Sequence, residues 1–283
     1  MILIDYSGIA ISNIMVQRIA LDENIIRHMI LNSIRMYRSK YKKQFGEIVI
    51  VADGDGNWRK DIFPQYKLGR KKSRDESPID WVEAFRIINM IFDEITENFP
   101  YKTMRVYGCE ADDVIAKIAL ETQEFGKHEE VMIVSSDKDF VQLQRYSNIK
   151  QYSPIGKKLL ETNNAKETLM EHVFRGCKSD KVPNILSPDN SFPDGIRQTP
   201  ITQKKIDVWM AADDLKSVMN EETYRNYCRN KKLIDLTETP QKIQTEIINT
   251  YEAQNPWSNK GKVFPYLVSK RCRLLLECVQ EFI

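Results

Sequence analysis

The sequence lacks three features that would assign it to a class of protein at once. It has no run of about 18 apolar residues without a charge, so it contains no candidate membrane-spanning helix. It opens with MILIDYSG, which enters a strand pattern without a basic leader, so we expect a cytoplasmic protein with no membrane partner. Its five cysteines form no C-x-x-C pair, which argues against a disulfide framework and against a zinc knuckle.

The chain also lacks a large net charge, because 42 Lys and Arg stand against 40 Asp and Glu and leave +2. Bulk charge therefore predicts no particular partner. The distribution of charge is more informative, since seven basic residues and one acid lie within residues 58–74. Lys67, Arg70, Lys71 and Arg74 recur at helical spacing, which predicts one cationic helix face of the kind that binds phosphate backbones.

Two interpretations of this basic segment stay open. Three aromatic residues lie within it, Trp58, Phe63 and Tyr66, and they either stack on unpaired bases or belong to the core. A run of like charges is, by itself, most often a solvated face. The segment follows a predicted strand that ends in an aspartate, so it should lie over a group of acids, and this position favours nucleic acid as the partner.

Three apolar runs, ILI, IVIVA and VMIV, are rich in Ile and Val and short of alternation, which is typical of parallel strands covered on both faces. Helical patterns separate them, and after about residue 170 helices and loops dominate. We therefore predict an α/β fold with a central, mostly parallel sheet over residues 1–170 and a helical region over residues 171–283. Within the second region, single helices are expected at 202–219, 221–230, 240–253 and 264–282.

Acidic residues follow each of the three runs and open one of the helices between them. In an open parallel sheet the carboxyl ends of the strands meet at one edge, so these acids should converge although they are far apart in sequence. Any one of them alone is more simply a turn former or a helix cap. Their coincidence at one predicted edge favours a shared function. The acids expected there are Asp5, Asp53, Glu110, Asp112, Asp113, Asp137 and Asp139.

Crowded carboxylates cannot all stay ionised unless positive charge lies among them. Magnesium prefers oxygen ligands, and two such ions about 4 Å apart can clamp the attacking and departing oxygens of a phosphodiester. No His or Cys occurs within these clusters, which counts against zinc. The residues therefore predict a magnesium site at the edge of the sheet.

Five motifs occur in the order found in 5′-nucleases of the flap endonuclease family, which the chain resembles over almost its whole length. The S-D-K-D-F-x-Q-L and E-A-D-D segments, in this order with the basic segment, are the most specific; V-A-D-G alone would be weak. The motifs are V-A-D-G (51–54), R-K followed by P-x-Y-K-x-x-R (59–70), E-A-D-D (110–113), S-D-K-D-F-x-Q-L (136–143) and G-C-K-S-D-K-V-P-N (176–184).

The resemblance implies a structure-specific 5′-to-3′ exonuclease and flap endonuclease that removes RNA primers and 5′ flaps during phage DNA replication. It implies two magnesium ions, for which manganese can substitute. Lys67 and Arg70 match the pair that steers the scissile phosphate, and Asp113 matches a supporting acid. The implied ligands are Asp5, Asp53, Glu110, Asp112 and Asp137 for the first ion and Asp139 and Asp180 for the second. The residues expected to bind nucleic acid are Arg59, Lys60, Tyr66, Lys71, Lys72 and Arg74.

The same resemblance sets the expected surroundings. The basic segment, at about residues 57–78, corresponds to an arch over the acids, and residues 171–200 resemble a helix-three-turn-helix element that holds duplex DNA. Expected substrates are branched or flapped DNA and RNA-DNA duplex. Expected protein partners are a single-stranded DNA-binding protein and a sliding clamp, and the protein should be a monomer in the host cytoplasm if a phage encodes it.

One motif departs from the family pattern G-D-x-S-D-N. Cys177 replaces the first aspartate and Lys181 the asparagine, so Asp180 is the lone acid of this motif and the second ion should be bound more weakly. A DNA-binding replication module that has lost activity is the alternative that this departure supports. A magnesium phosphatase acting on small molecules would explain the acids but not the cationic segment.

Overall fold

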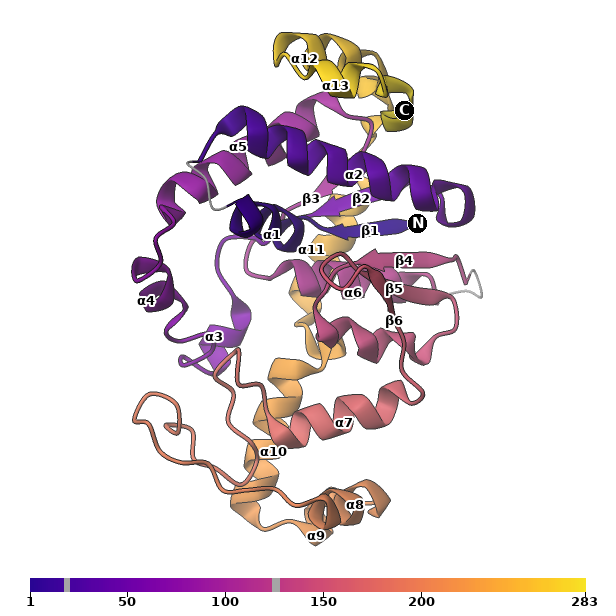
Figure 1. Ribbon diagram of the computed structural model, residues 1–283. Coiled ribbons are helices and arrows are strands. Elements are labelled where there is room, and N and C mark those ends of the chain that lie inside the picture. Colours follow the sequence, from indigo (N-terminus) through magenta and orange to yellow (C-terminus); the bar gives the residue numbers. More distant parts are fainter. Residues whose placement is uncertain (18–20, 124–127) are drawn as a thin grey trace.

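The computed structural model describes residues 1–17, 21–123 and 128–283. Its centre is a six-stranded sheet in the order β3-β2-β1-β4-β5-β6, in which every neighbouring pair is parallel except β5 and β6 (Figure 1). All three apolar runs form adjacent strands at its middle, as predicted. The strands are Ile2–Asp5 (β1), Ile48–Val51 (β2), Lys102–Met104 (β3), Val131–Val134 (β4), Ile149–Ser153 (β5) and Lys158–Leu160 (β6).

Alternate residues of the central strands enter two cores, one on each face of the sheet. Ile2 and Ile4 pack with the helices of the first face, whereas Leu3 packs with those of the second. Ile and Val fit this setting because their branched side chains pack well on a pleated surface that is buried on both sides. Helices Tyr6–Gln17 (α1), Glu23–Phe45 (α2) and Trp81–Asn98 (α5) cover the first face, and Ala111–Glu121 (α6) and Gln241–Glu252 (α11) cover the second.

The basic segment contains two short helices, Trp58–Ile62 (α3) and Arg70–Asp75 (α4), which Figure 1 shows at one side of the sheet. The prediction of one cationic helix face running from Lys67 to Arg74 is wrong. Gly69 adopts a left-handed conformation, with φ of 87°, directly before α4, and Lys67 has a φ of 57°. Lys67 therefore lies outside the helix and points independently of the basic residues within it.

Beyond the sheet, Ala165–Arg175 (α7) and Glu221–Ile234 (α10) pack against each other and carry the short helices Gln203–Ala211 (α8) and Leu215–Val218 (α9) (Figure 1). The single helices predicted at 202–219 and 264–282 are each broken. The second comprises Val263–Ser269 (α12) and Arg273–Leu276 (α13), flanked by 3₁₀ turns. Within the described residues, no helix combines the length and the apolar character that crossing a membrane requires.

The last helices return to the sheet. Ile247 of α11 joins the core beneath α6, and Leu267 and Phe282 join the core beneath α2 and α5. Phe99 contacts Phe282 with their ring centroids 5.4 Å apart. Residues 241–283 thus pack within the α/β layers, although they follow the helical region in the sequence. The part that projects from the sheet is formed by α7 to α10.

Candidate active site

Strand register brings the first two acids together. β1 is hydrogen-bonded in parallel to β4, with Ile4 opposite Val134, so the chain leaves both strands at the same level. There the Ser135 hydroxyl donates to Asp5 Oδ2 at 2.7 Å and accepts a hydrogen bond from the backbone N–H of Asp137 at 3.1 Å. Ser135 therefore links the Asp5 carboxylate to the backbone of Asp137.

The second strand and the next helix contribute acids to the same edge. Asp53, two residues beyond β2, accepts a hydrogen bond from the backbone N–H of Ala111 at 3.0 Å, so it lies at the N-terminus of α6. Glu110 is the N-cap residue of α6 and forms a capping box with Asp113. An acidic side chain at this end is also favoured by the helix dipole. The sheet edge and the α6 terminus thereby form one acidic rim.

Two further acids lie beside this rim. Asp139 is in the 3₁₀ helix Lys138–Arg145 (η2), and its carboxylate lies 3.3 Å from Nδ1 of His172 on α7. Asp180 lies in the turn after α7 and binds Nη2 of Arg70 at 2.6 Å and the hydroxyl of Tyr66 at 3.3 Å. With Asp112 in the first turn of α6, the seven acids implied as ligands are contributed to the rim and its surroundings by five separate segments.

Proton affinities reflect this crowding. The pKa of Asp5 is raised to about 6, mainly by burial, and the neighbouring Asp53 and Asp137 contribute to this rise. Burial also raises the pKa of Asp139 to about 7, again with Asp137 and Asp180 contributing. The pKa of Asp112 is raised well above its usual value by burial and by Asp137. Each carboxylate makes its neighbours harder to ionise, which is the conflict that a bound cation resolves.

The chemistry of these side chains fits a hard divalent cation, since the donors are carboxylate oxygens and the crowded acids need compensating charge. Within residues 1–17, 21–123 and 128–283, however, no three acidic, His or Cys side chains already converge in a geometry that could hold a metal ion. Two of the acids are instead engaged by basic side chains of the arch. These two acids are Glu110, bound by Lys67, and Asp180, bound by Arg70.

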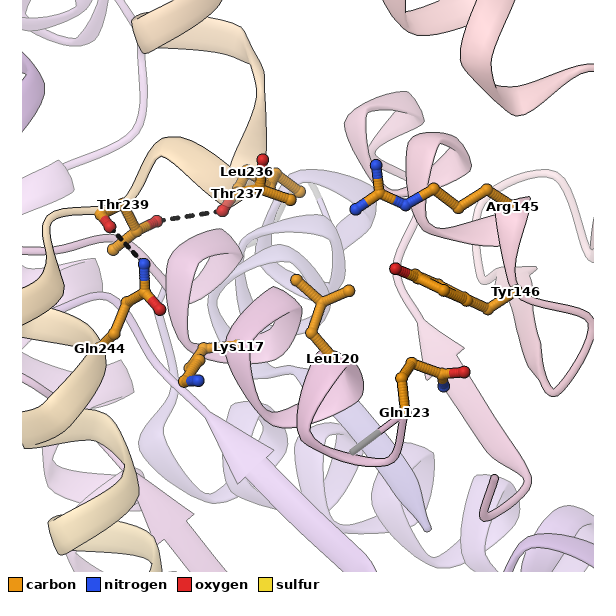
Figure 2. Close-up of a pocket in the computed structure, with 9 residues that line it drawn as sticks. All are labelled: Lys117, Leu120, Gln123, Arg145, Tyr146, Leu236, Thr237, Thr239 and Gln244. Atoms are coloured by element: carbon orange, nitrogen blue, oxygen red, sulfur yellow. Dashed lines mark hydrogen bonds between the residues drawn. The ribbon is translucent and has the colours of Figure 1, made fainter. Parts of the chain in front are cut away.

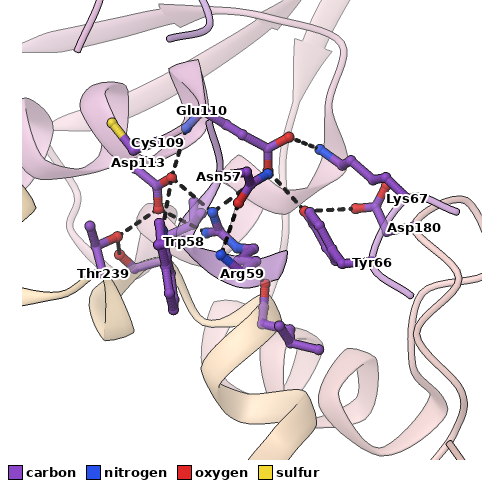
Figure 3. A network of polar contacts seen from close by, with 12 residues as sticks. Asn57, Trp58, Arg59, Tyr66, Lys67, Cys109, Glu110, Asp113, Asp180 and Thr239 are labelled. Atoms are coloured by element: carbon purple, nitrogen blue, oxygen red, sulfur yellow. Dashed lines mark hydrogen bonds and ion pairs between the residues drawn. The ribbon is translucent and has the colours of Figure 1, made fainter. Parts of the chain in front are cut away.

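Figure 3 shows the contact between arch and rim. Lys67 Nζ forms an ion pair with Glu110, and the Tyr66 hydroxyl donates to the other carboxylate oxygen of Glu110 at 2.9 Å. Although burial disfavours the charged form of Glu110, Lys67 and Arg59 lower its pKa. The backbone N–H of Lys67 also donates to the carbonyl of Asp180 at 2.7 Å, which ties the arch to the turn after α7. The cationic segment therefore sits directly on the acids.

Comparison with known proteins agrees with this arrangement. The family model for the 5′-3′ exonuclease N-terminal resolvase-like domain matches residues 5–173, and the model for the C-terminal part of T4 RNase H matches residues 164–282. Ribonuclease H of Enterobacteria phage T4 is 32% identical to the chain over 99% of its length and 95% of the relative. The chain belongs to the 5′-3′ exonuclease family. Its members hydrolyse phosphodiester bonds in nucleic acids, so the chain is an enzyme of this class.

More distant relatives share parts of the sequence or the fold. Flap endonuclease Xni of Shewanella sp. (strain MR-4) is 32% identical over 49% of the chain and 52% of that relative. The bacteriophage T5 D15 protein, crystallised with metal ions, superimposes with a TM-score of 0.63 over 89% of the chain and 99% of the T5 protein, at 13% identity. This last likeness establishes the shared fold, including the helical region that follows the sheet.

Arg59 of this 5′-3′ exonuclease lies inside the protein, which corrects its predicted role in gripping the DNA strand. Its side chain is only 2% exposed and forms two hydrogen bonds with Asp113, at 2.8 and 2.9 Å (Figure 3). Its Nε donates to the carbonyl of Leu233 at 2.9 Å. Asp113 is fully buried, so it cannot reach a substrate, and the expectation that this supporting acid takes part in catalysis is corrected to a structural role.

The aromatic residues of the segment are core residues, so the second of the two open interpretations is the correct one. Trp58, Phe63 and Tyr66 are each at most 7% exposed. Trp58 Nε1 donates to Asp113 at 3.3 Å, and the hydroxyl of Tyr66 is occupied by two carboxylates. Tyr66 therefore positions acids of the rim and does not present a face on which a base could stack.

The other basic residues predicted to bind nucleic acid are at least partly accessible to solvent in this exonuclease. Lys60, Lys71 and Lys72 are exposed, and Arg74 is half-buried with its guanidinium 4.8 Å from the ring of Phe85. A cavity of about 750 Å³ separates α4 from the turn at residues 178–181 and carries cationic side chains on both sides. The cations along it are Arg70, Lys72, Arg74, Lys178 and Lys181.

The motif that departs from the family pattern, at residues 176–184, forms a compact turn in which Cys177 and Val182 make an isolated antiparallel bridge. Lys181 has a φ of 61°, a left-handed conformation in which asparagine is favoured over lysine. The residue that replaces the family's asparagine therefore occupies a strained position. The Cys177 thiol lies 3.0 Å from the Ser179 hydroxyl, and burial raises its pKa to about 11, so it stays protonated at neutral pH.

Three residues at the site were not singled out from the sequence. His172 contacts Asp139, and Ser135 joins Asp5 to Asp137. Gln151 of β5 is fully buried and donates from Nε2 to the carbonyls of Ser135 and Asp137, at 3.0 and 2.6 Å. The serines directly before Asp137 were the available signal, because a hydroxyl after a buried strand is well placed to bind neighbouring carboxylates.

A second cavity of this exonuclease, about 310 Å³, lies away from the acids between α6, η2 and the segment that precedes α11 (Figure 2). Arg145 and Tyr146 line one side, and Thr239 and Gln244 line the other. Gln244 Nε2 donates to the Thr239 carbonyl at 2.6 Å, so the polar groups on that side bind each other. None of the predicted site residues lines this cavity.

Proposed function

We propose that this 5′-3′ exonuclease is a magnesium-dependent, structure-specific nuclease that removes RNA primers and 5′ flaps during phage DNA replication. One observation carries the proposal: a cationic arch contacts an acidic rim directly, through Lys67 on Glu110 and Arg70 on Asp180. The carboxylates of the rim, which favour a bound cation, thus lie next to the basic side chains of the arch, which favour a bound anion. A phosphodiester with bound divalent ions supplies both at once.

We assign the acids to two ion sites, with the second the weaker. Magnesium, or manganese in its place, would supply Lewis acidity and an activated water when bound. Lys67 and Arg70 would neutralise the phosphate oxygens, and Ser135 and Gln151 would hold Asp5 and Asp137 in place. Asp180 is engaged by Arg70 and Tyr66, which supports weaker binding at the second site. The proposed ligands are Asp5, Asp53, Glu110, Asp112 and Asp137 for the first ion and Asp139 and Asp180 for the second.

The wider assignments follow the same proposal. Residues 1–170 would be the catalytic region and residues 171–283 the region that holds duplex DNA, with Lys60, Lys71, Lys72 and Arg74 as backbone contacts. The substrates would be flapped DNA and RNA-DNA duplex. A single-stranded DNA-binding protein and a sliding clamp would be its partners in the host cytoplasm, and the enzyme would act as a monomer.

A cleavage assay tests this function. Purified protein is incubated with a duplex that carries an end-labelled 5′ flap, with magnesium alone and with magnesium plus EDTA. We expect short labelled products only where magnesium is free, because the rim needs a cation to bind the phosphate. Binding to the flap without any products would favour the DNA-binding module instead. Neither binding nor products, together with hydrolysis of small phosphate esters, would favour the phosphatase.

Removal of the Lys67 amine should strengthen the binding of divalent ions in the absence of DNA. Lys67 and an ion compete for Glu110, and relief of one close like-charge contact corresponds to about a tenfold gain in affinity. Isothermal titration of manganese into Lys67→Met and into wild-type protein measures the difference. Lys72→Met is the matched control, since it removes the same charge from a side chain that is 80% exposed.

Cleavage should respond in the opposite direction. Lys67→Met should cut the flap substrate more slowly than wild type at saturating manganese, because the phosphate has lost a cation that neutralises it. Equal manganese affinities for Lys67→Met and Lys72→Met would show that Lys67 does not occupy an ion site.

A further inference from the structure

A small hollow adjoins the acidic rim at the carboxyl ends of β1 and β4. It has a volume of about 180 Å³, and Asp5 and Asp137 line one wall. The other wall is mostly apolar, with Ile9 of α1 and with Pro154 and Ile155 from the turn between β5 and β6, and Ser12 and Ser136 are its polar residues. A ligand that fills this hollow must therefore combine a group for the acidic rim with an apolar surface next to it.

Ile155 stands out among the residues of this wall because 73% of its surface is exposed. Its position is nevertheless fixed. The backbone N–H of Ile155 donates to the Ser136 hydroxyl at 3.1 Å, and that hydroxyl lies 2.8 Å from the hydroxyl of Ser153. The Ser153 hydroxyl in turn accepts a hydrogen bond from the N–H of Gly156 at 3.0 Å. The turn that carries Ile155 is thus attached to the residue directly before Asp137.

This attachment sets Ile155 apart from apolar residues scattered over the surface, which need no explanation. The same short segment, Ser135 to Asp137, positions the acids through one serine and the apolar turn through the other. Acids and apolar wall therefore keep a fixed spacing. A free phosphate could reach the acids only through bound cations and would leave the wall bare, whereas a nucleotide offers a phosphate for those cations and, beside it, a base with two apolar faces.

We propose that Pro154 and Ile155 form the apolar wall of a subsite for the unpaired base of the nucleotide adjoining the cleaved phosphate. The subsite rests on the proposed nuclease function. Contact with the face of a base is insensitive to its identity, so the subsite distinguishes an unpaired nucleotide from a stacked, paired one without reading sequence. It gives this enzyme a way to select single-stranded ends that does not depend on the arch.

The test uses the full chain and two kinds of 5′-flap substrate. One kind is intact; the other carries an abasic nucleotide on the 5′ side or on the 3′ side of the cut. For Ile155→Ser we expect a KM about fivefold higher on the intact flap, because serine removes most of the apolar surface that would cover the base, with kcat nearly unchanged. On one of the two abasic flaps, the KM of wild type should also be about fivefold higher than on the intact flap, because the base that contacts Ile155 is missing. The KM of Ile155→Ser should be the same on that abasic flap as on the intact flap. Ile155→Leu keeps an apolar side chain at this position, so its KM should equal that of wild type.

Leu274→Ser on α13 is the matched control, because Leu274 is 65% exposed and is not among the residues that line the hollow. Equal KM values for Ile155→Ser and wild type on the intact flap would overturn the subsite, as would an increase of the same size on both abasic flaps. A wild-type protein that cleaves no flap at all would instead overturn the proposed function, and the subsite with it.

Discussion

Asp137→Asn is expected to abolish cleavage of the 5′ flap while leaving its binding intact. Asp137 lies at the centre of the rim, where its charge raises the pKa of Asp5, Asp112 and Asp139. If Asp137 holds an ion as proposed, loss of its charge removes several kcal/mol of electrostatic stabilisation from the reaction centre. Since each 1.36 kcal/mol is a factor of ten, the expected loss in cleavage rate is about 10³-fold.

The substitution is well suited to separating chemistry from folding. Asp137 is the N-cap residue of η2, and its Oδ1 accepts a hydrogen bond from the backbone N–H of Asp139 at 2.9 Å. Asparagine caps a helix as well as aspartate does, so the amide oxygen can keep this bond while the charge is lost. Thermal unfolding followed by circular dichroism should therefore give nearly the same midpoint for the variant and wild type.

Single-turnover cleavage and fluorescence anisotropy with a labelled flap measure the two expected effects. Asp213→Asn, at an exposed aspartate between α8 and α9, controls for loss of one negative charge and should cleave at the wild-type rate. Cleavage by Asp137→Asn within tenfold of wild type would remove Asp137 from the ion site. A large loss of flap affinity would instead make it a residue for binding.

The acidic rim could be predicted because it follows from the period and direction of strands. Three Ile- and Val-rich runs that each lead to an aspartate are sufficient to place Asp5, Asp53 and Asp137 at one edge once the strands are parallel. The observed register confirms that the ends of these strands are level, since Asp5 lies opposite Val51, the last residue of β2. Asp180 is different, since no local sequence pattern predicts its position. Only the resemblance to the family motif predicted that it lies near the rim.

The fate of the basic segment could not be predicted from spacing. Helical spacing from Lys67 to Arg74 suggested one face, but Gly69 takes a left-handed conformation that separates Lys67 from the helix. The burial of Arg59 depends on groups that are distant in the chain: Asp113 is 54 positions away, and Leu233 is 174 positions away. A count of charges cannot distinguish Arg59 from Lys60, because tertiary contacts decide which of the two side chains is exposed to solvent.

Arg59→Met is expected to lower the free energy of unfolding by about 3–5 kcal/mol, the cost of leaving a buried charge without its partner. Methionine keeps the length of the side chain but provides no donor for Asp113 or for the Leu233 carbonyl. Asp113 is held besides by Trp58, at 3.3 Å, and by the Thr239 hydroxyl, at 2.7 Å, and neither of these carries a charge. Urea denaturation followed by circular dichroism measures the loss.

Two companion variants identify the cause. Addition of Asp113→Asn to Arg59→Met removes the uncompensated charge and should recover part of the lost stability, whereas two independent defects would add. Lys60→Met, at the exposed neighbour, should change the free energy of unfolding by less than about 0.5 kcal/mol. If Arg59→Met keeps wild-type stability but loses affinity for the flap, then Arg59 leaves the core to bind DNA. If stability falls as expected, the buried Arg59–Asp113 pair holds the base of the arch on the start of α6. The position of the arch over the acids then depends on a contact inside the protein that the substrate does not reach.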